Sequence, residues 1–214
     1  MNQRVNRRVV VTRHGGPDVL RVAEDPVPEP GAGEVRVKVL AAGVSAFDLI
    51  YRNWARLPGS PTLPFAPGED IVGVVDAVGE GVLSVEPGQV VAGGTWVLGV
   101  GGGYAEFVCL PAGELVAVPE GVDPAEAVCL VVNYLTAHQH LHHIGQVRHG
   151  ERILVHGAAG GVGTAVLELG RLAGLELYGT ASGAHLDFVA SYGATPIDYR
   201  SEDFPARIRD LTGD

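Results

Sequence analysis

The pattern of apolar and polar positions changes near residue 120. Before that point, short stretches alternate apolar and polar residues and are separated by stretches rich in Gly and Pro. Alternation with a period of two residues predicts half-buried strands, and many short strands at close spacing predict a compact, barrel-like β domain. We expect these strands at Arg7–Thr12, Leu20–Ala23, Glu34–Ala42, Ile71–Val78, Gln89–Ala92 and Ala105–Leu110.

From residue 124 onward, helical and strand patterns alternate. Pro124–Leu141 has apolar residues at helical spacing, with Asp123 as the expected N-cap and Pro124 at the first helical position. The alternation predicts an α/β arrangement with a parallel sheet. The expected strands are Arg152–His156, Leu175–Thr180 and Thr195–Tyr199, and the expected helices that follow them are Gly163–Ala173, Ala184–Tyr192 and Glu202–Leu211.

These two patterns predict two domains. Residues 1–123 form the β domain, and residues 124–214 form one βαβαβ half of a doubly wound domain. A complete dinucleotide-binding fold has two such halves, so we expect the chain to be part of a longer protein. Without the second half, one edge of the strand Arg152–His156 is expected to lack a neighbour.

Composition limits the classes of function. The chain has 214 residues, of which 46% are hydrophobic and 19% charged, as is typical of a globular protein. Its net charge of −10 opposes binding to nucleic acid or to anionic membrane surfaces. No segment approaches the roughly 20 apolar residues of a membrane span, and Cys109 and Cys129 have no CxxC partner. We therefore expect a cytoplasmic protein without disulfides.

A glycine-rich turn follows the apolar strand Arg152–His156. Residues 158–163 read Ala-Ala-Gly-Gly-Val-Gly, which is the pattern GxGxxG with Ala in place of the first Gly. Between a strand and a helix this pattern is typical of the Rossmann fold, in which backbone N–H groups and the helix N-terminus bind a dinucleotide pyrophosphate. The alternative is a tight turn without a ligand. The predicted pyrophosphate-binding residues are Ala158, Ala159, Gly160, Gly161, Val162 and Gly163.

The end of the next strand indicates which nicotinamide cofactor binds. An NAD site has Asp or Glu there to accept from the ribose 2′-hydroxyl, but no acidic residue precedes Asp187 in this loop. Ser182, His185 and Tyr199 are instead expected to hold the 2′-phosphate of NADP(H). No Lys or Arg lies in the Ser182 loop itself, so phosphate neutralisation would rest on His185 and Arg200. An ordinary loop surface is the alternative.

Six segments carry a family resemblance: Gly-Gly-Pro-Asp-Val-Leu (15–20), Pro-Glu-Pro-Gly-Ala-Gly-Glu-Val (28–35), Ala-Ala-Gly-Val (41–44), Val-Gly-Glu-Gly-Val (78–82), Gly-Gly-Tyr-Ala-Glu (102–106) and the strand and turn at 154–163. In this order they resemble the zinc-independent quinone oxidoreductase branch of the medium-chain dehydrogenase/reductase superfamily. The resemblance implies a GroES-like β-barrel catalytic domain followed by a Rossmann domain, with the active site in the cleft between them. It also implies an NADPH-dependent enzyme that reduces a quinone or another α,β-unsaturated carbonyl, as a homodimer when full length.

Departures from the zinc-dependent relatives predict that no metal binds. Those relatives carry Cys soon after the Ala-Ala-Gly segment and His before a Glu, whereas here Ser45 and the Gly-Glu-Asp of residues 68–70 stand at these positions. Two acidic residues alone cannot supply the three protein ligands of a catalytic zinc. His138 and His142, at i and i+4 on one helical face, are the alternative metal ligands. They also suit the negative end of a helix dipole without any metal.

The resemblance also implies residues for the reaction site. Relatives usually carry Asn in place of Ser45, against the nicotinamide or the substrate, and Ser45 can still donate a hydrogen bond with shorter reach. Asp48 and Tyr51 are further catalytic candidates, with an anchored loop and simple packing as the respective alternatives. Thr136, within Asn-Tyr-Leu-Thr-Ala, is the expected nicotinamide contact. Loops such as residues 54–64 and 95–103 are expected to supply the substrate pocket.

Two functions are open at this point. The first is NADPH-dependent reduction of a quinone or enone, in which the cofactor supplies the hydride and the protein orients the reactants and excludes water. The second is a non-catalytic nucleotide-binding or interaction protein that keeps the fold, which Ser45 in place of Asn and the incomplete second domain favour. Turnover of NADPH with quinones and enals distinguishes the two.

Overall fold

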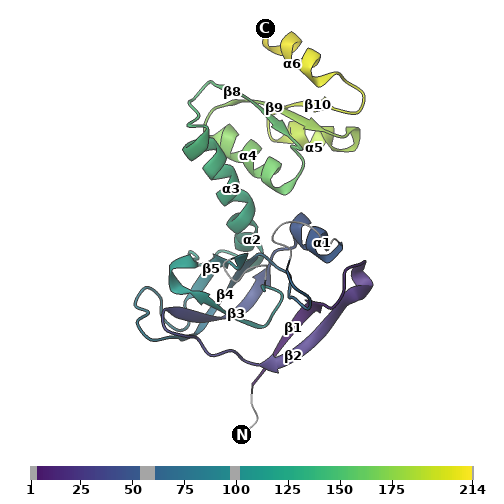
Figure 1. Ribbon diagram of the computed structural model, residues 1–214. Coiled ribbons are helices and arrows are strands. Elements are labelled where there is room, and N and C mark those ends of the chain that lie inside the picture. Colours follow the sequence, from purple (N-terminus) through teal and green to yellow (C-terminus); the bar gives the residue numbers. More distant parts are fainter. Residues whose placement is uncertain (1–3, 54–60, 97–101, 214) are drawn as a thin grey trace. The chain divides into compact units, whose positions relative to one another are not determined.

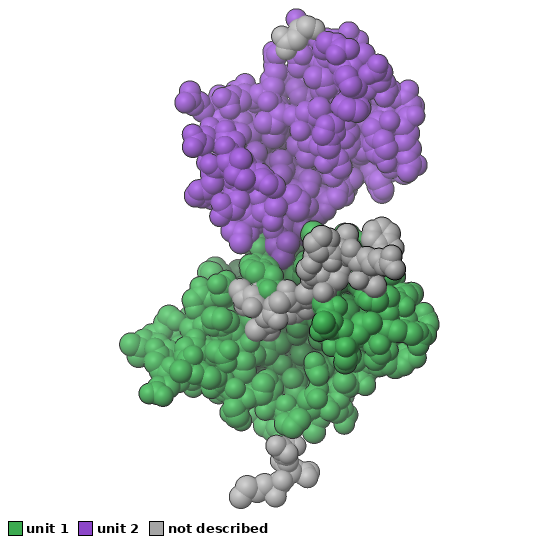
Figure 2. Space-filling view, in the orientation of Figure 1, with its two compact units in different colours: residues 1–131 green, residues 132–214 purple. Residues whose placement is uncertain are grey.

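Two compact units make up the chain. The computed structural model describes residues 4–53, 61–96 and 102–213. Contacts divide the chain into residues 1–131 and residues 132–214, which are coloured separately in Figure 2. Buried hydrophobic residues form separate clusters within each unit. Each unit is therefore packed around its own core.

Antiparallel strands form the framework of the first unit (Figure 1). They are β1 (Val5–Val11), β2 (Leu20–Pro26), β3 (Glu34–Ala42), β4 (Asp70–Val78), β5 (Val90–Gly94), β6 (Phe107–Pro111) and β7 (Leu115–Ala117). One sheet has the order β6-β3-β4-β5-β7, and β1 pairs with β2 in another. Side chains on one face of the larger sheet, such as Val37, Ile71 and Leu110, are fully buried and form its main core.

Helix α1 (Ala46–Asn53) follows β3 and begins with reciprocal hydrogen bonds of the capping-box type. The Ser45 hydroxyl accepts from the backbone N–H of Phe47 at 3.1 Å, and the Asp48 carboxylate accepts from the N–H of Ser45 at 2.7 Å. The alternation pattern indicated strands only in this half, so it missed both α1 and the three-residue strand β7. The capping contacts fix the position of Ser45 relative to Asp48.

A long helical run begins at Pro124, as the sequence predicts. It comprises α2 (Pro124–Cys129), a wider π-helical turn (Leu130–Tyr134), α3 (Leu135–His138) and a second π-helical turn (Gln139–Ile144). The N-cap prediction is confirmed, because the Asp123 carboxylate accepts from the N–H of Ala125 at 2.9 Å. Ala127 and Val128 of α2 pack with Val72 of β4, within the first unit. The domain boundary at residues 123/124 stays a prediction.

The second unit is a parallel α/β layer structure (Figure 1). Its strands β8 (Arg152–His156), β9 (Glu176–Ala181) and β10 (Thr195–Asp198) pair in parallel in the order β10-β9-β8. Its helices are α4 (Gly161–Leu172), α5 (Leu186–Ser191) and α6 (Phe204–Thr212). Leu167 and Val189 are fully buried in its core. Among the described residues, β8 pairs with β9 alone and so lies at the edge of the sheet.

Candidate functional site

The glycine-rich turn joins β8 directly to the N-terminus of α4. Gly157 has a φ of 65°, in the left-handed region that favours glycine. The turn closes with a hydrogen bond from the N–H of Gly160 to the carbonyl of Gly157 at 2.9 Å, and Gly160 is the N-cap of α4. The N–H groups of residues 161–163 begin the helix and have no acceptor within it. They are the groups that an anion at this helix end would contact.

The glycines of this turn have two different roles. A Cβ on Gly163 would overlap the carbonyl oxygen of Gly157 and approach the Cα of Ala158 to 2.8 Å, so glycine is needed there for close packing of helix against turn. Gly160 and Gly161 are exposed instead. A Cβ on Gly160 would meet only the carbonyl oxygen of Gly157, at 3.2 Å. Unlike Gly163, Gly160 is not needed for close packing. Its lack of a side chain leaves room for a ligand.

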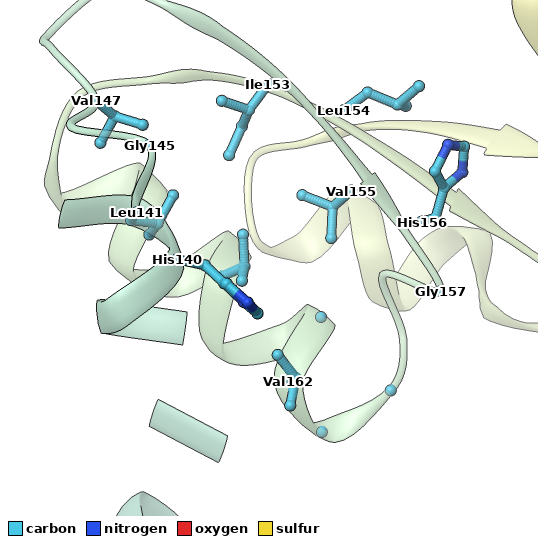
Figure 3. Close-up of a pocket in the computed structure, with 14 residues that line it drawn as sticks. His140, Leu141, Gly145, Val147, Ile153, Leu154, Val155, His156, Gly157 and Val162 are labelled. Carbon is cyan, nitrogen blue, oxygen red and sulfur yellow. The ribbon is translucent and has the colours of Figure 1, made fainter. Parts of the chain in front are cut away.

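An open pocket of about 540 Å³ adjoins the turn within the second unit. The second π-helical turn, β8, the glycine-rich turn and the start of α4 line it. Figure 3 shows Ile153 and Val155 on the side of β8 that faces α4, and Val162 at the start of that helix. Its walls are thus largely apolar, while backbone N–H groups of the glycine-rich turn lie at one end. This combination fits a dinucleotide pyrophosphate.

The expected ribose-binding residues lie at the carboxyl ends of β9 and β10. Asp198 pairs with Ala181 in the parallel register, so Ser182 and Tyr199 follow two adjacent strand ends. Ser182 is half-buried, and His185 and Tyr199 are exposed. The Arg200 guanidinium lies 5.8 Å from the centroid of the Tyr199 ring.

Sequence reasoning did not identify Asp198 as part of this region. A Cβ on Gly183 would lie 3.1 Å from the Oδ2 of Asp198, so this carboxylate faces the Ser182 loop. It also accepts hydrogen bonds from the N–H of Arg200 and the hydroxyl of Ser201, both at 3.0 Å. An acidic group therefore lies beside the predicted 2′-phosphate position, on a strand that the motif does not include.

Thr136 lies in α3 and is half-buried. One turn earlier, the Asn133 side chain lies beside Gly161, where a Cβ would approach it to 2.8 Å. The Tyr134 hydroxyl donates to the Glu168 carboxylate of α4. These contacts hold the segment of residues 133–137 against α4, next to the glycine-rich turn. The role of Thr136 as the nicotinamide contact stays a prediction.

In the first unit, Asp48 is the centre of a polar group that we call the Asp48 cluster: Ser45, Asp48, Glu69, Asp70 and Tyr104. The Asp48 carboxylate is 7% exposed and accepts from the N–H groups of Ser45 and Gly68, each at 2.7 Å. It also accepts from the Tyr104 hydroxyl at 3.2 Å. Burial and the charge of Asp48 raise the pKa of Tyr104. Asp48 thus anchors three segments that are distant in sequence.

Glu69 joins this cluster through Ser45. The Ser45 hydroxyl lies 3.4 Å from a Glu69 carboxylate oxygen. Asp70, which is 7% exposed, accepts from the N–H of Gly43 at 3.0 Å. Burial first, and then the charges of Asp48 and Asp70, raise the pKa of Glu69, while the bond to Ser45 acts in the opposite direction.

Tyr51 lies in α1 with Ser45 and Asp48 but in a different environment. Its ring packs against the small buried cluster of Val11, Val19 and Phe65 and stacks with Phe47 at a centroid distance of 6.0 Å. Among the described residues, the hydrogen bonds of the Asp48 cluster do not include the Tyr51 hydroxyl. The predicted pocket loops fall largely on residues 54–60 and 97–101, outside the described residues.

No group of three or more His, Cys, Asp or Glu side chains in the described part of the chain has the geometry of a metal site. The rings of His138 and His142 lie 4.7 Å apart, and both are exposed. Across the same described ranges, no helix has the length and apolar character needed to span a membrane.

Comparison with known proteins places these features in a family. Residues 31–120 match the family model of the alcohol dehydrogenase GroES-like domain. The quinone oxidoreductase of Rattus norvegicus is 34% identical over 216 residues, covering 99% of this chain and 64% of that protein. The synaptic vesicle membrane protein VAT-1 homolog of the same species is 38% identical over 212 residues, covering 96% of this chain and 51% of that protein.

The structural comparison agrees with the sequence comparison. The crystal structure of Escherichia coli quinone oxidoreductase complexed with NADPH has a TM-score of 0.86 at 27% identity, covering 97% of this chain and 63% of that one. The chain thus spans between half and two thirds of the length of these relatives. The predicted fold class, a GroES-like domain followed by part of a Rossmann domain, is confirmed. The chain is thus similar over almost its whole length to quinone oxidoreductases, and its resemblance to the quinone oxidoreductase-like branch of the medium-chain dehydrogenase/reductase superfamily is confirmed.

Proposed function

We propose that this chain is the part of an NADPH-dependent oxidoreductase that binds the adenosine side of the cofactor and supplies polar groups to a reaction site for a quinone or other α,β-unsaturated carbonyl. The observation that carries the proposal is the turn between β8 and α4, where exposed Gly160 and Gly161 leave the helix N-terminus open. The crystal structure of the E. coli relative, a complex with NADPH, supports the choice of cofactor. The reaction proposed here needs no zinc.

When bound, NADPH supplies the hydride, and the residues of this chain bind and orient it. The N–H groups of residues 161–163 hold the pyrophosphate, together with the backbone of the turn at Ala158 and Ala159. Ser182, His185 and Tyr199 contact the 2′-phosphate of the adenosine ribose, and Thr136 contacts the nicotinamide. Ser45 lies at the substrate, with Asp48 fixing its position through the 2.7 Å bond to its N–H. Tyr51 contributes to the wall of the same region.

NADPH oxidation with a panel of quinones and enals tests this function. We expect loss of absorbance at the reduced nicotinamide band only when an acceptor is present, and faster loss with NADPH than with NADH. Binding of NADPH by the full-length protein without turnover of any acceptor would support the non-catalytic nucleotide-binding alternative, which the presence of Ser45 in place of Asn favours. The homodimer and the cytoplasmic location stay predictions.

A further inference from the structure

The three carboxylates of the Asp48 cluster differ in how they are bonded. Asp48 and Asp70 are each 7% exposed and accept hydrogen bonds from backbone N–H groups. These bonds use the carboxylate oxygens of Asp48 and Asp70 to hold the backbone in place. Glu69 is only half-buried, and among the described residues the Ser45 hydroxyl is the one hydrogen-bond partner of its carboxylate. Glu69 is therefore the acid of this cluster that can exchange protons with water.

Ser45 is half-buried and lies next to Glu69 at the start of α1. Its hydroxyl oxygen accepts from the N–H of Phe47 at 3.1 Å, which fixes the oxygen at the start of α1. The flanking side chains Val44 and Phe47 are 80% and 50% exposed, so an apolar surface surrounds this end of the helix. A hydroxyl within hydrogen-bond reach of a carboxyl group, at the edge of an exposed surface, can pass a proton from that group to a bound substrate.

We propose that Glu69 is the proton source of the reaction and that it acts through the Ser45 hydroxyl, which touches the substrate. This inference rests on the proposed function, since it assigns a role at the same reaction site. Ser45 is then the catalytic residue, and Glu69 the residue that supplies and positions its proton. The Ser45 side chain is shorter than the usual Asn. The Glu69 carboxyl group beside it compensates by supplying the proton that Ser45 passes on.

The proton balance of the step is complete. Hydride addition to the β-carbon of the enone places two electrons on the substrate and leaves negative charge on its enolate. The Ser45 O–H then gives its proton to the enolate, and the Ser45 oxygen takes the proton of the Glu69 carboxyl group. Glu69 becomes a carboxylate and is protonated again by water. The substrate is reduced by two electrons, and the nicotinamide is oxidised.

The charges around Glu69 favour the protonated form that this relay needs. Asp48 of α1 and Asp70 of β4 both face it, and burial acts in the same direction. The Tyr104 hydroxyl bonds to Asp48 rather than to Glu69. No Lys or Arg within the described ranges is among the groups that act on Glu69. The pKa of Glu69 is accordingly raised, with the bond to Ser45 as the one opposing influence.

Carbon NMR titration of the Glu69 carboxyl group tests the relay without turnover, with the resonance assigned by Glu69→Gln. We expect a midpoint above the ordinary glutamate value of about 4.3. Ser45→Ala should move the midpoint higher still, because the Ser45 hydrogen bond lowers the pKa of Glu69. An ordinary midpoint, or one that Ser45→Ala leaves in place, would overturn the relay.

The pH profile of turnover gives the second test. Wild-type kcat should fall as the pH rises through the Glu69 midpoint, whereas Glu69→Gln should give a flat profile and, at acidic pH, a loss on the order of 100-fold. Glu120→Gln, which neutralises an exposed carboxylate of the same unit, should keep the wild-type profile. Retention of the wild-type pH dependence by Glu69→Gln contradicts the relay. A full-length wild-type protein that turns over no acceptor contradicts the proposed function and with it the relay, whereas turnover whose pH dependence Glu69→Gln leaves in place contradicts the relay alone.

Discussion

At the residue scale, Glu69 connects the chemistry of the Asp48 cluster with the stability of the fold. Burial and the charges of Asp48 and Asp70 raise its pKa. A carboxyl group whose pKa is higher in the folded than in the unfolded state binds more protons when folded, so its contribution to stability is lost as the pH rises through the folded pKa. The ionised carboxylate is therefore unfavourable for folding at neutral and alkaline pH.

Glu69→Gln is expected to raise the melting temperature at pH 8 and to lose that advantage as the pH falls toward 4. Because the side chain is partly exposed, solvent screening keeps the gain below about 1 kcal/mol. Calorimetric unfolding of wild type, Glu69→Gln and the exposed control Glu120→Gln across this pH range checks the expectation. A Glu69→Gln protein that is less stable than wild type at pH 8 would contradict the electrostatic account.

The negative charge of Asp198 opposes the proposed binding of the 2′-phosphate of NADPH. Its carboxylate faces the Ser182 loop, where a 2′-phosphate is proposed to bind. Removal of a like charge at contact distance in a solvated site is worth about 1 kcal/mol, or roughly a fivefold change in binding. Asp198→Asn should therefore tighten NADPH and leave NADH nearly unchanged, as measured by titration calorimetry. An equal effect on both cofactors would place the 2′-phosphate elsewhere.

At the element scale, local signals explain most of the boundaries. β3 and β8 have the bounds that alternation and apolar runs predict, and the helical run begins where Asp123 and Pro124 indicate. Each of these boundaries was predictable because its signals lie within a few residues of one another in the sequence. α1 was missed because only alternation was followed in this half, although Ser45 and Asp48 stand at the local spacing of a capping box. The π-helical turns after Cys129 have no local sequence signal that we recognise.

Asp123 gives the element-scale prediction. Its carboxylate caps α2, whose Ala127 and Val128 pack on Val72. Asp123→Ala should cost about 1 kcal/mol of folding stability, whereas Asp123→Asn, which keeps a side-chain acceptor, should cost much less. Urea unfolding of the two variants measures the difference. Equal stability of Asp123→Ala and wild type would show that packing alone fixes the start of this helix.

At the scale of the whole molecule, each of the two units has its own core and its own group of candidate residues, the Asp48 cluster in the first and the glycine-rich turn in the second. The glycine-rich turn was predictable because its strand, turn and helix are contiguous, as the motif requires. The Asp48 cluster was only partly predictable, because Asp48, Glu69 and Tyr104 meet through long-range pairing. Asp198 was missed for the same reason, since its approach to Gly183 depends on the parallel register of β9 and β10.

The most direct test of the account is NADPH titration of the Gly160→Asp variant against wild type and Gly160→Ser. Gly160 is an N-cap with φ −82° and ψ 168°, a conformation that Asp and Ser adopt readily, so both variants should fold with a stable α4. The Asp carboxylate occupies the position proposed for the pyrophosphate. We predict loss of NADPH binding in Gly160→Asp, with a smaller loss in Gly160→Ser. A folded Gly160→Asp protein that binds NADPH as wild type does would contradict the placement of the cofactor at this turn.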